Sequence, residues 1–272
     1  MTYADDLALA LAISDEVDAL TIAGSLSDFA VETKNDDTPV TAIDRAAEHL
    51  VRDRLTAARP NDAIVGEEFG ASRGALDPVG GKSFARRWVV DPIDGTKNFV
   101  RGVPAWATLI GLVDGDEAVV GVVSAPALGR RWYAALGSGA WGVTHVHGFP
   151  TAPRRLQVST VTNLSEASVS FSSLSGWEER GMLGPFLDLT RAARRVRAFG
   201  DFWSYMMVAE GQVDVACEPE LALHDMVALA PIVTEAGGRF TSLGGESGPF
   251  GGDALASNGA LHSAVLATLT AA

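Results

Sequence analysis

The stretch Asp91-Pro92-Ile93-Asp94-Gly95-Thr96 constrains this chain most, because it forces a turn at the end of the strand-like run 87–90. Proline fixes its own φ and keeps the preceding residue extended, so the chain leaves the strand straight and then turns. The carboxylates of Asp91 and Asp94 can then share one concavity, with the carbonyl of Ile93 between them. Such oxygens suit Mg²⁺, which takes few protein carboxylates and completes its octahedron with water and phosphate.

Gly95 and Thr96 follow these carboxylates at the start of a short helix-compatible run. Glycine permits close approach of a ligand, and backbone amides at a helix start favour an anion, so the pair predicts a phosphate cradle. The alternative is an ordinary surface turn, because Asp-Pro and Asp-Gly are common turn dipeptides.

Three further acids accompany this turn. Glu67 follows the strand-like residues 63–65, Asp225 opens an apolar helix that ends near Gly237, and Asp44 begins a second helix. Each has a structural alternative: a solvated loop charge for Glu67, a helix-dipole interaction for Asp225 and a capping box with Thr41 for Asp44.

The composition excludes several classes of protein. With 272 residues, 47% of them hydrophobic and 20% charged, the chain can bury a sizeable core and is unlike disordered proteins. Its net charge of −13 repels nucleic acid and anionic membrane surfaces, so neither is an expected partner. A small phosphorylated substrate stays compatible with this charge if a bound divalent cation neutralises it.

The single cysteine, Cys217, allows no intramolecular disulfide, and no Cys/His cluster has zinc spacing. The N-terminus lacks a basic region, and no apolar run is long enough to span a bilayer. We expect a cytoplasmic protein.

The sequence predicts an N-terminal half, residues 1–150, and a C-terminal half, residues 151–272, with the boundary between 145 and 155, where one Gly and two Pro fall within residues 145–153. In the first half we expect an antiparallel meander, and in the second half strands layered with helices. Gly and polar residues over 70–82 predict a surface loop. The expected helices cover 4–23, the run after Thr41, 185–194, 202–210 and 223–236, and the expected strands cover 63–65, 88–90, 107–113, 118–124, 131–136, 167–171, 196–199 and 213–217.

Taken in order, these motifs resemble the inositol monophosphatase-like family of Mg²⁺-dependent, lithium-sensitive phosphatases. The resemblance covers nearly the whole chain and implies an αβαβα sandwich of the inositol monophosphatase and fructose-1,6-bisphosphatase type, as well as a homodimer. It rests on residues 38–44, 66–68 and 91–96 and on Asp225 with its Thr-Glu-Ala-Gly-Gly sequel, residues 234–238.

The resemblance also implies roles for single residues. Two or three Mg²⁺ ions would bind the side chains of Glu67, Asp91, Asp94 and Asp225 and the carbonyl of Ile93. Asp44 and Thr96 would polarise the attacking water, with Glu67 a further catalytic residue, and Asp94, Gly95 and Thr96 would bind the phosphate.

Hydrolysis by such a site follows from charge. A phosphate monoester dianion repels nucleophiles, and clustered Mg²⁺ neutralises it, activates a water and stabilises the leaving alkoxide. We expect in-line attack without a phosphoenzyme, because Cys217 lies in an apolar run and no Gly-x-Ser-x-Gly elbow exists.

Three loops, residues 101–108, 170–177 and 197–202, resemble the bacterial histidinol-phosphate phosphatases within this family. Their substrate carries an ammonium and an imidazole, so its pocket should contain acids. Asp201 and Glu218 are the acids we expect there, and Glu218 matches the family position that contacts the non-phosphate part of the substrate. A helix N-cap is the alternative for Asp201.

Two other functions stay open at this stage. One is a different phosphatase of the same family, acting on inositol phosphate or on 3′-phosphoadenosine 5′-phosphate. The other is a module that binds phosphometabolites without turning them over.

His224 departs from the family pattern, which has Trp before the metal-binding Asp. Packing is its simplest role. An imidazole that gains charge in acid would also oppose a neighbouring Mg²⁺ ion.

Overall fold

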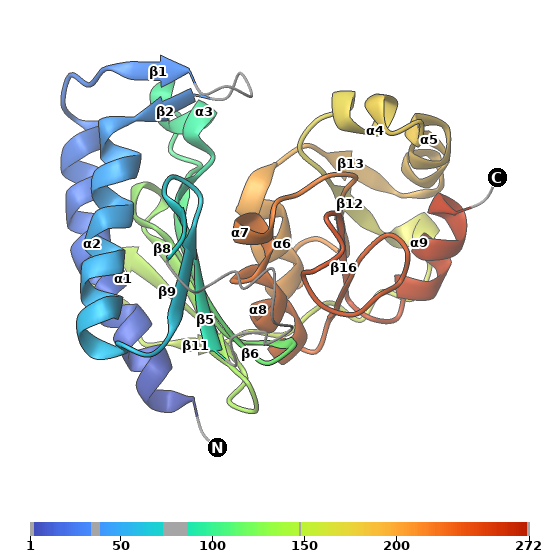
Figure 1. Ribbon diagram of the computed structural model, residues 1–272. Coiled ribbons are helices and arrows are strands. Elements are labelled where there is room, and N and C mark those ends of the chain that lie inside the picture. The colour runs from blue at the N-terminus through green and yellow to red at the C-terminus, as the bar shows by residue number, and fades with distance from the viewer. Residues whose placement is uncertain (1–2, 34–38, 73–85, 147, 271–272) are drawn as a thin grey trace, which may run out of the picture.

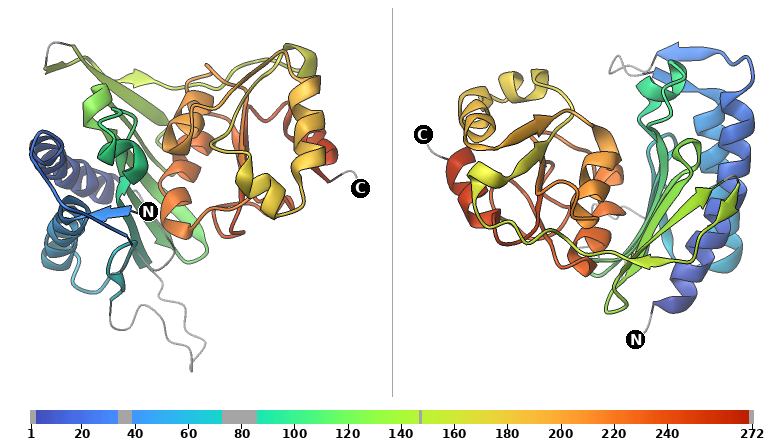
Figure 2. Two further views of the ribbon diagram at one scale, coloured as in Figure 1. Left: turned by 90° about the horizontal axis from the view of Figure 1, so that it is seen from above. Right: turned by 180° about the vertical axis from the view of Figure 1, so that it is seen from behind.

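The structure is a computed structural model that describes residues 3–33, 39–72, 86–146 and 148–270. Helices and sheets alternate in five layers, so the predicted αβαβα sandwich is confirmed (Figures 1 and 2). The outer helices on one side are α1 (Ala4–Ser25) and α2 (Ala42–Ala58), the central ones are α6 (Asp201–Ala209), α7 (Leu223–Met226) and α8 (Leu229–Glu235), and those on the other side are α4 (Ser175–Glu179), α5 (Leu183–Ala192) and α9 (His262–Leu269).

The first sheet lies between the α1/α2 layer and the central helices, in the strand order β10-β9-β8-β7-β6-β5-β3-β4, with β11 paired to β9. Most neighbours are antiparallel, as the predicted meander requires, but β3 and β5 are parallel. Its strands are β3 (Ala63–Gly66), β4 (Gly70–Ala71), β5 (Arg86–Asp94), β6 (Ala107–Asp114), β7 (Glu117–Ala125), β8 (Arg130–Ala135), β9 (Ala140–Val146), β10 (Phe149–Pro150) and β11 (Arg154–Arg155).

The second sheet separates the central helices from α4, α5 and α9 and has the strand order β13-β12-β14-β16-β15. A short hairpin and one short helix complete the part of the chain near the functional motifs. The strands are β12 (Ser168–Ser170), β13 (Arg195–Arg197), β14 (Val215–Glu218), β15 (Arg239–Thr241) and β16 (Ala254–Ser257), the hairpin is β1 (Val31–Thr33) with β2 (Pro39–Thr41), and the helix is α3 (Thr96–Val100).

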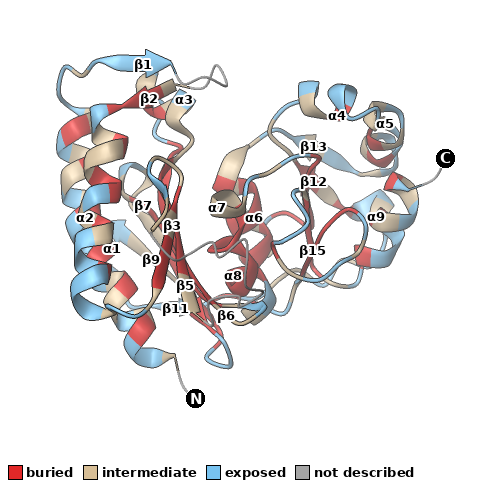
Figure 3. Cartoon of the chain, in the orientation of Figure 1, coloured by how far each residue is buried: buried red, intermediate tan, exposed pale blue. Residues whose placement is uncertain are grey.

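Each interface between layers has its own apolar core, and strand alternation assigns side chains to one core or another. On β6, Ile110 packs with the α1/α2 layer, whereas Leu109 packs with the central helices. The second sheet covers a third core with α5 and α9. The inner strands β5 and β6 are therefore buried on both faces and largely red in Figure 3, whereas the outer strand β13 is mostly exposed.

Two predicted elements differ from the structure. The helix expected over 223–236 is split into α7 and α8, because the ring of Pro231 would clash with the carbonyl four residues earlier, at Val227. Within the loop expected over 70–82, Gly70 and Ala71 form β4, and residues 73–82 lie outside the described ranges.

The break between α7 and α8 rests on a pair of glycines in the first sheet. Gly111 and Gly121 lie opposite each other on β6 and β7. A Cβ at Gly121 would lie 2.0 Å from the carbonyl oxygen of Ala228, and one at Gly111 would lie 2.5 Å from Val227. Only glycine leaves room for this backbone, which carries Asp225 to the edge of the sheet.

Candidate active site

A cavity of about 750 Å³ opens where the first sheet meets the central helices, and the predicted site residues converge on it. Its carboxylates outnumber its cations by eight to one among the described lining residues, since Lys97 is the single basic side chain. Asp44 lies just behind this lining, within hydrogen-bond distance of Thr96. The predicted residues that line the cavity are Glu67, Asp91, Ile93, Asp94, Gly95, Thr96, Asp201, Glu218 and Asp225.

The parallel pairing of β3 with β5 brings the first two carboxylates together. Gly66 is the register partner of Val90, so Glu67 and Asp91 both follow the same end of the pair. The amide of Glu67 donates to the carbonyl of Val90 at 3.1 Å. Asp91 is 2% exposed, and its Oδ1 accepts the amide of Ile93 at 3.0 Å.

Two groups of side chains could hold a metal ion. Carboxylate oxygens of Asp91, Asp94 and Asp225 lie within 4.8 Å of one another, and so do ligand atoms of Glu67, Asp91 and His224. Oxygen donors of this kind fit Mg²⁺ or Mn²⁺, and the imidazole adds one nitrogen donor.

The turn after β5 has the sharp geometry that its sequence predicts. Gly95 has a φ of 85°, in the left-handed region, and a Cβ there would lie 2.9 Å from the carbonyl oxygen of Ala105. Thr108 on β6 donates its hydroxyl to the carbonyl of Pro92 at 2.8 Å. The turn is therefore held to its neighbouring strand, and α3 begins at Thr96.

Asp44 and Thr96 come together from α2 and α3. Oδ2 of Asp44 accepts the amide of Thr41 at 2.8 Å and its hydroxyl at 2.5 Å, which makes the capping box. Oδ1 of Asp44 lies 3.4 Å from the hydroxyl of Thr96, which is also 3.0 Å from the carbonyl of Ile93. The cap therefore does not compete with a role in the site, because it uses the other carboxylate oxygen.

Burial and mutual repulsion shift the protonation of these acids. Burial, followed by the charges of Glu67 and Asp94, raises the pKa of Asp91 well above its usual value. The pKa of Asp94 is raised in the same way by burial and by Asp201, and that of Asp225 mainly by burial. A bound cation would relieve this repulsion.

Asp201 lies at the start of α6 with a φ of 50°, a conformation that non-glycine residues rarely adopt. The N-cap of α6 is Gly200, so the N-cap alternative for Asp201 is wrong. Its amide donates to Oγ of Ser172 at 2.9 Å, and its Oδ2 accepts Nδ2 of Asn98 at 3.1 Å. Asp94 instead accepts the next amide, that of Phe202, at 2.7 Å.

Two buried polar atoms beside the cavity have no hydrogen-bond partner in the described part of the chain. They are Oε1 of Glu218 and the hydroxyl of Tyr205, on side chains 5% and 1% exposed. Burial raises the pKa of Glu218 to about 7, against hydrogen bonds from Ser172. Sequence reasoning missed Tyr205, although it lies four residues after Asp201 and hence on the same helix face.

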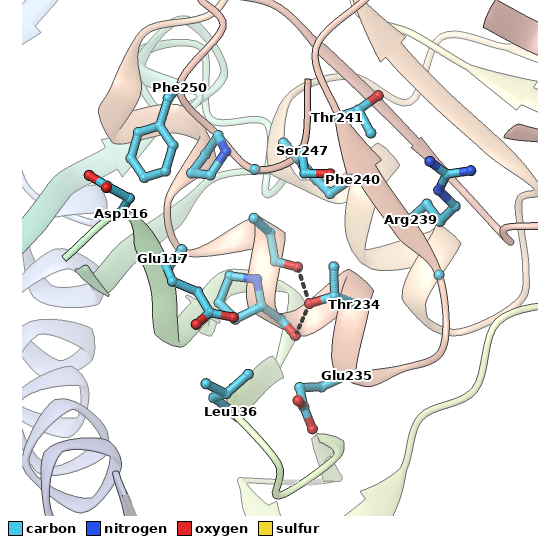
Figure 4. Close-up of a pocket in the computed structure, with 16 residues that line it drawn as sticks. Asp116, Glu117, Leu136, Thr234, Glu235, Arg239, Phe240, Thr241, Ser247 and Phe250 are labelled. Carbon is cyan, nitrogen blue, oxygen red and sulfur yellow. Dashed lines mark hydrogen bonds between the residues drawn. The ribbon is translucent and has the colours of Figure 1, made fainter. Parts of the chain in front are cut away.

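A second cavity, of about 360 Å³, lies at the other end of α8 and is drawn in Figure 4. Of its acids, Glu235 accepts the amides of Gly137 and Gly139 at 2.8 and 2.6 Å, so its carboxylate holds a turn. Among the described residues, the groups that could hold a metal ion both lie at the first cavity. The first cavity, of about 750 Å³, is therefore the candidate active site.

Comparisons with known proteins agree with this geometry. Residues 7–272 match the profile of the inositol monophosphatase family. The chain is 56% identical to a histidinol-phosphatase of Streptomyces coelicolor over 98% of this chain and 97% of the relative, and 53% identical to one of Mycobacterium tuberculosis over 98% of each. A solved Thermotoga maritima IMPase superposes with a TM-score of 0.81 at 30% identity, over 97% of this chain and 96% of that one. None of the described helices could cross a bilayer.

Proposed function

The chain belongs to the inositol monophosphatase family, and from that premise we propose that it hydrolyses L-histidinol phosphate to L-histidinol and phosphate, with Mg²⁺ as its metal. The names of two relatives above 50% identity support the substrate. The observation that carries the proposal is the acidic wall formed by Asp201 and Glu218 in the cavity that also contains the metal-binding carboxylates.

The charge of the cavity supports the need for a metal. The eight carboxylates and one ammonium of the described lining residues would repel a phosphate dianion, so the anion would enter together with cations. The residues that would hold two or three ions are the side chains of Glu67, Asp91, Asp94 and Asp225 and the carbonyl of Ile93. When bound, Mg²⁺ supplies the charge that neutralises the ester and the Lewis acidity that water and the leaving oxygen require.

The chain's own residues would then orient the reaction. Asp44 keeps Oδ1 beside the hydroxyl of Thr96, so this pair would hold a water, and Asp44 would accept its proton. Burial raises the pKa of Asp44 and makes its carboxylate a better proton acceptor. The amides of Gly95 and Thr96 would donate to the phosphate oxygens at the start of α3.

Two polar atoms beside the cavity without a hydrogen-bond partner among the described residues, Oε1 of Glu218 and the hydroxyl of Tyr205, support a cationic substrate. A buried carboxylate oxygen without a partner is costly, and an ammonium or imidazolium would satisfy it. Oε1 of Glu218 and the carboxylate of Asp201 would bind this cationic end. The hydroxyl of Tyr205 would provide a further hydrogen bond there.

Release of inorganic phosphate from a panel of esters tests the proposal. We expect Mg²⁺-dependent turnover with kcat/KM highest for L-histidinol phosphate, and lower for inositol 1-phosphate and 3′-phosphoadenosine 5′-phosphate. A higher kcat/KM for either of the others would assign the chain to another activity of the family. Binding without release of phosphate would instead favour the non-catalytic module.

The proposal extends to assembly and location. The family resemblance implies a homodimer, and the cytoplasm is the compartment that we propose for it. Light scattering on the purified protein would report twice the mass of 28.4 kDa if the dimer forms.

A further inference from the structure

We propose that Glu48 is a positioning residue that fixes the turn carrying Glu67, so that Glu67 stays beside Asp91 before any cation binds. The inference rests on the proposed function only in that Glu67 is taken as a metal ligand. Glu48 itself lies on α2, outside the residues that line the cavity.

The carboxylate of Glu48 is fully buried and accepts hydrogen bonds from the turn. Its Oε2 accepts the amide of Glu68 at 2.7 Å, and its Oε1 accepts the amide of Phe69 at 3.2 Å. These are the two amides that directly follow Glu67. Hydrogen bonds to a charged acceptor are roughly twice as strong as neutral ones, so the turn is held at two consecutive points.

Arg52 closes the other side of this arrangement. Its Nε donates to Oε1 of Glu48 at 2.7 Å, and its guanidinium also donates to the carbonyl of Gly70. The ring of Phe69 lies against His49, with centroids 4.1 Å apart. One surface of α2 therefore holds residues 68–70 through Glu48, Arg52 and His49.

Gly66 shows how closely the acid approaches the strand. A Cβ at this position would lie 2.0 Å from Oε1 of Glu48 and 2.3 Å from its Cδ. The φ of Gly66 is not positive, so its backbone conformation would accept other residues. Glycine is required here because the carboxylate of Glu48 occupies the space that a side chain would need.

The helix surface that holds this turn also carries Asp44. Asp44, Glu48 and Arg52 follow one another at intervals of four and lie on one side of α2. The same rigid element thus sets the water-orienting carboxylate and the turn of a metal ligand. A buried carboxylate is destabilising unless its oxygens are paired, and the carboxylate of Glu48 is paired with the amides of the turn and with Arg52.

Glu48→Gln tests the proposal, because the amide keeps one acceptor but turns an NH₂ group toward the backbone donors. In the metal-free variant we expect the amides of Glu68 and Phe69 to exchange with deuterium faster than in the unmodified protein. In calorimetric titration we expect Mg²⁺ affinity to fall about 10-fold to 100-fold, the range seen when groups that orient metal ligands are removed. At saturating Mg²⁺, kcat should stay within a few-fold.

Two further variants separate positioning from stability. Gly66→Ala displaces the same carboxylate without changing charge and should weaken Mg²⁺ binding likewise. Leu55→Ala removes buried volume from the same helix away from the turn, so it should lower the melting temperature and leave Mg²⁺ affinity unchanged. If Glu48→Gln does not fold, Arg52→Gln removes the hydrogen bond from Arg52 to Glu48 and should give a smaller loss of Mg²⁺ affinity.

Unchanged Mg²⁺ affinity and unchanged amide exchange in the Glu48→Gln protein would overturn the inference. An equal loss of affinity in Leu55→Ala would overturn it too, because stability alone would then explain the effect. The proposed function fails in a different way, when the unmodified protein neither binds Mg²⁺ nor releases phosphate. Amide exchange is measured without metal and still reports on Glu48 in that case.

Discussion

The acids of the two halves are held in different ways. In the N-terminal half, Asp44 and Asp91 each accept a backbone amide within three residues of their own position. In the C-terminal half, Oε1 of Glu218 is buried and has no hydrogen-bond partner within the described ranges, and Asp201 lies in a strained backbone conformation. The first arrangement is satisfied by the local chain. The second leaves room for a ligand to complete it. On the proposed function the acids of the first half perform the chemistry together with Asp225, the locally held acid of the second half, and Asp201 and Glu218 select the substrate.

The largest expected effect lies in the N-terminal half. Asp91→Asn removes charge from the metal-binding group at nearly constant volume, and kcat should fall on the order of 10³-fold. The metal-free variant should melt at or above the temperature of the unmodified protein, because repulsion with Glu67 and Asp94 is relieved. Phosphate release and melting curves in EDTA and in Mg²⁺ measure both effects. A variant that kept full activity would contradict the assigned division of labour.

The C-terminal acids should control selectivity. Glu218→Gln and Asp201→Asn should each raise KM for L-histidinol phosphate about 30-fold, the loss of about 2 kcal/mol expected for one partner of a desolvated charge pair. A phosphate ester whose alcohol part carries no positive charge lacks this contact and should be affected little. Steady-state kinetics on the two esters measure the KM of each. An equal rise in KM for both would show that these acids act on the reaction or the metals and not on substrate selection.

Gly121→Ala tests the close contact between the two halves, in which Gly111 and Gly121 pack against Val227 and Ala228. Its Cβ would meet the carbonyl of Ala228, so we expect a loss of about 1–3 kcal/mol in the free energy of unfolding. Mg²⁺ affinity should also fall, because the same backbone carries Asp225. Gly184→Ala is the matched control, since a Cβ there meets nothing within 4 Å. Equal urea midpoints for the two variants would show that Gly121 and Ala228 are not closely packed.

The stability of the metal-free protein should depend on pH through Glu218. Its folded-state pKa of about 7 lies above the ordinary value of 4.5, so the folded protein holds the proton more tightly and loses stability as pH rises between these values. Glu218→Gln removes this loss and should be more stable than the unmodified protein by about 2–3 kcal/mol at pH 8, with no such gain below pH 5. Melting curves in EDTA across this range would refute the cause if both proteins lost stability in parallel.

His224 should have the smallest effect. Its ring nitrogen lies near Glu67 and Asp91, and imidazole is a better ligand for Mn²⁺ than for Mg²⁺. His224→Trp, which restores the residue usual in the family, should lower Mn²⁺ affinity a few-fold and leave Mg²⁺ affinity nearly unchanged. Parallel calorimetric titrations with the two ions check this, and equal shifts for both would exclude a role for the nitrogen.

Sequence by itself determined the parts of the molecule that short segments define. The capping box at Thr41 and Asp44, the turn at residues 91–96 and the meander of β6, β7 and β8 follow from residues next to one another, because propensity, capping and proline geometry act over a few positions. The order of the acidic motifs also sufficed to predict the family and the αβαβα layers. The parallel pairing of β3 with β5, which brings Glu67 to Asp91, was not among the predictions made from the sequence.

Tertiary structure alone decided the contacts between distant segments. Nothing near Glu48 in the sequence distinguishes it from an ordinary helical acid, and its partners at Glu68 and Phe69 lie 20 and 21 residues away. Asp94 and Phe202 are 108 residues apart, yet one hydrogen bond joins them. Such pairs depend on how layers pack, and the free energy of packing is shared among many side chains. No local sequence pattern therefore predicts which distant polar groups form hydrogen bonds in the folded chain.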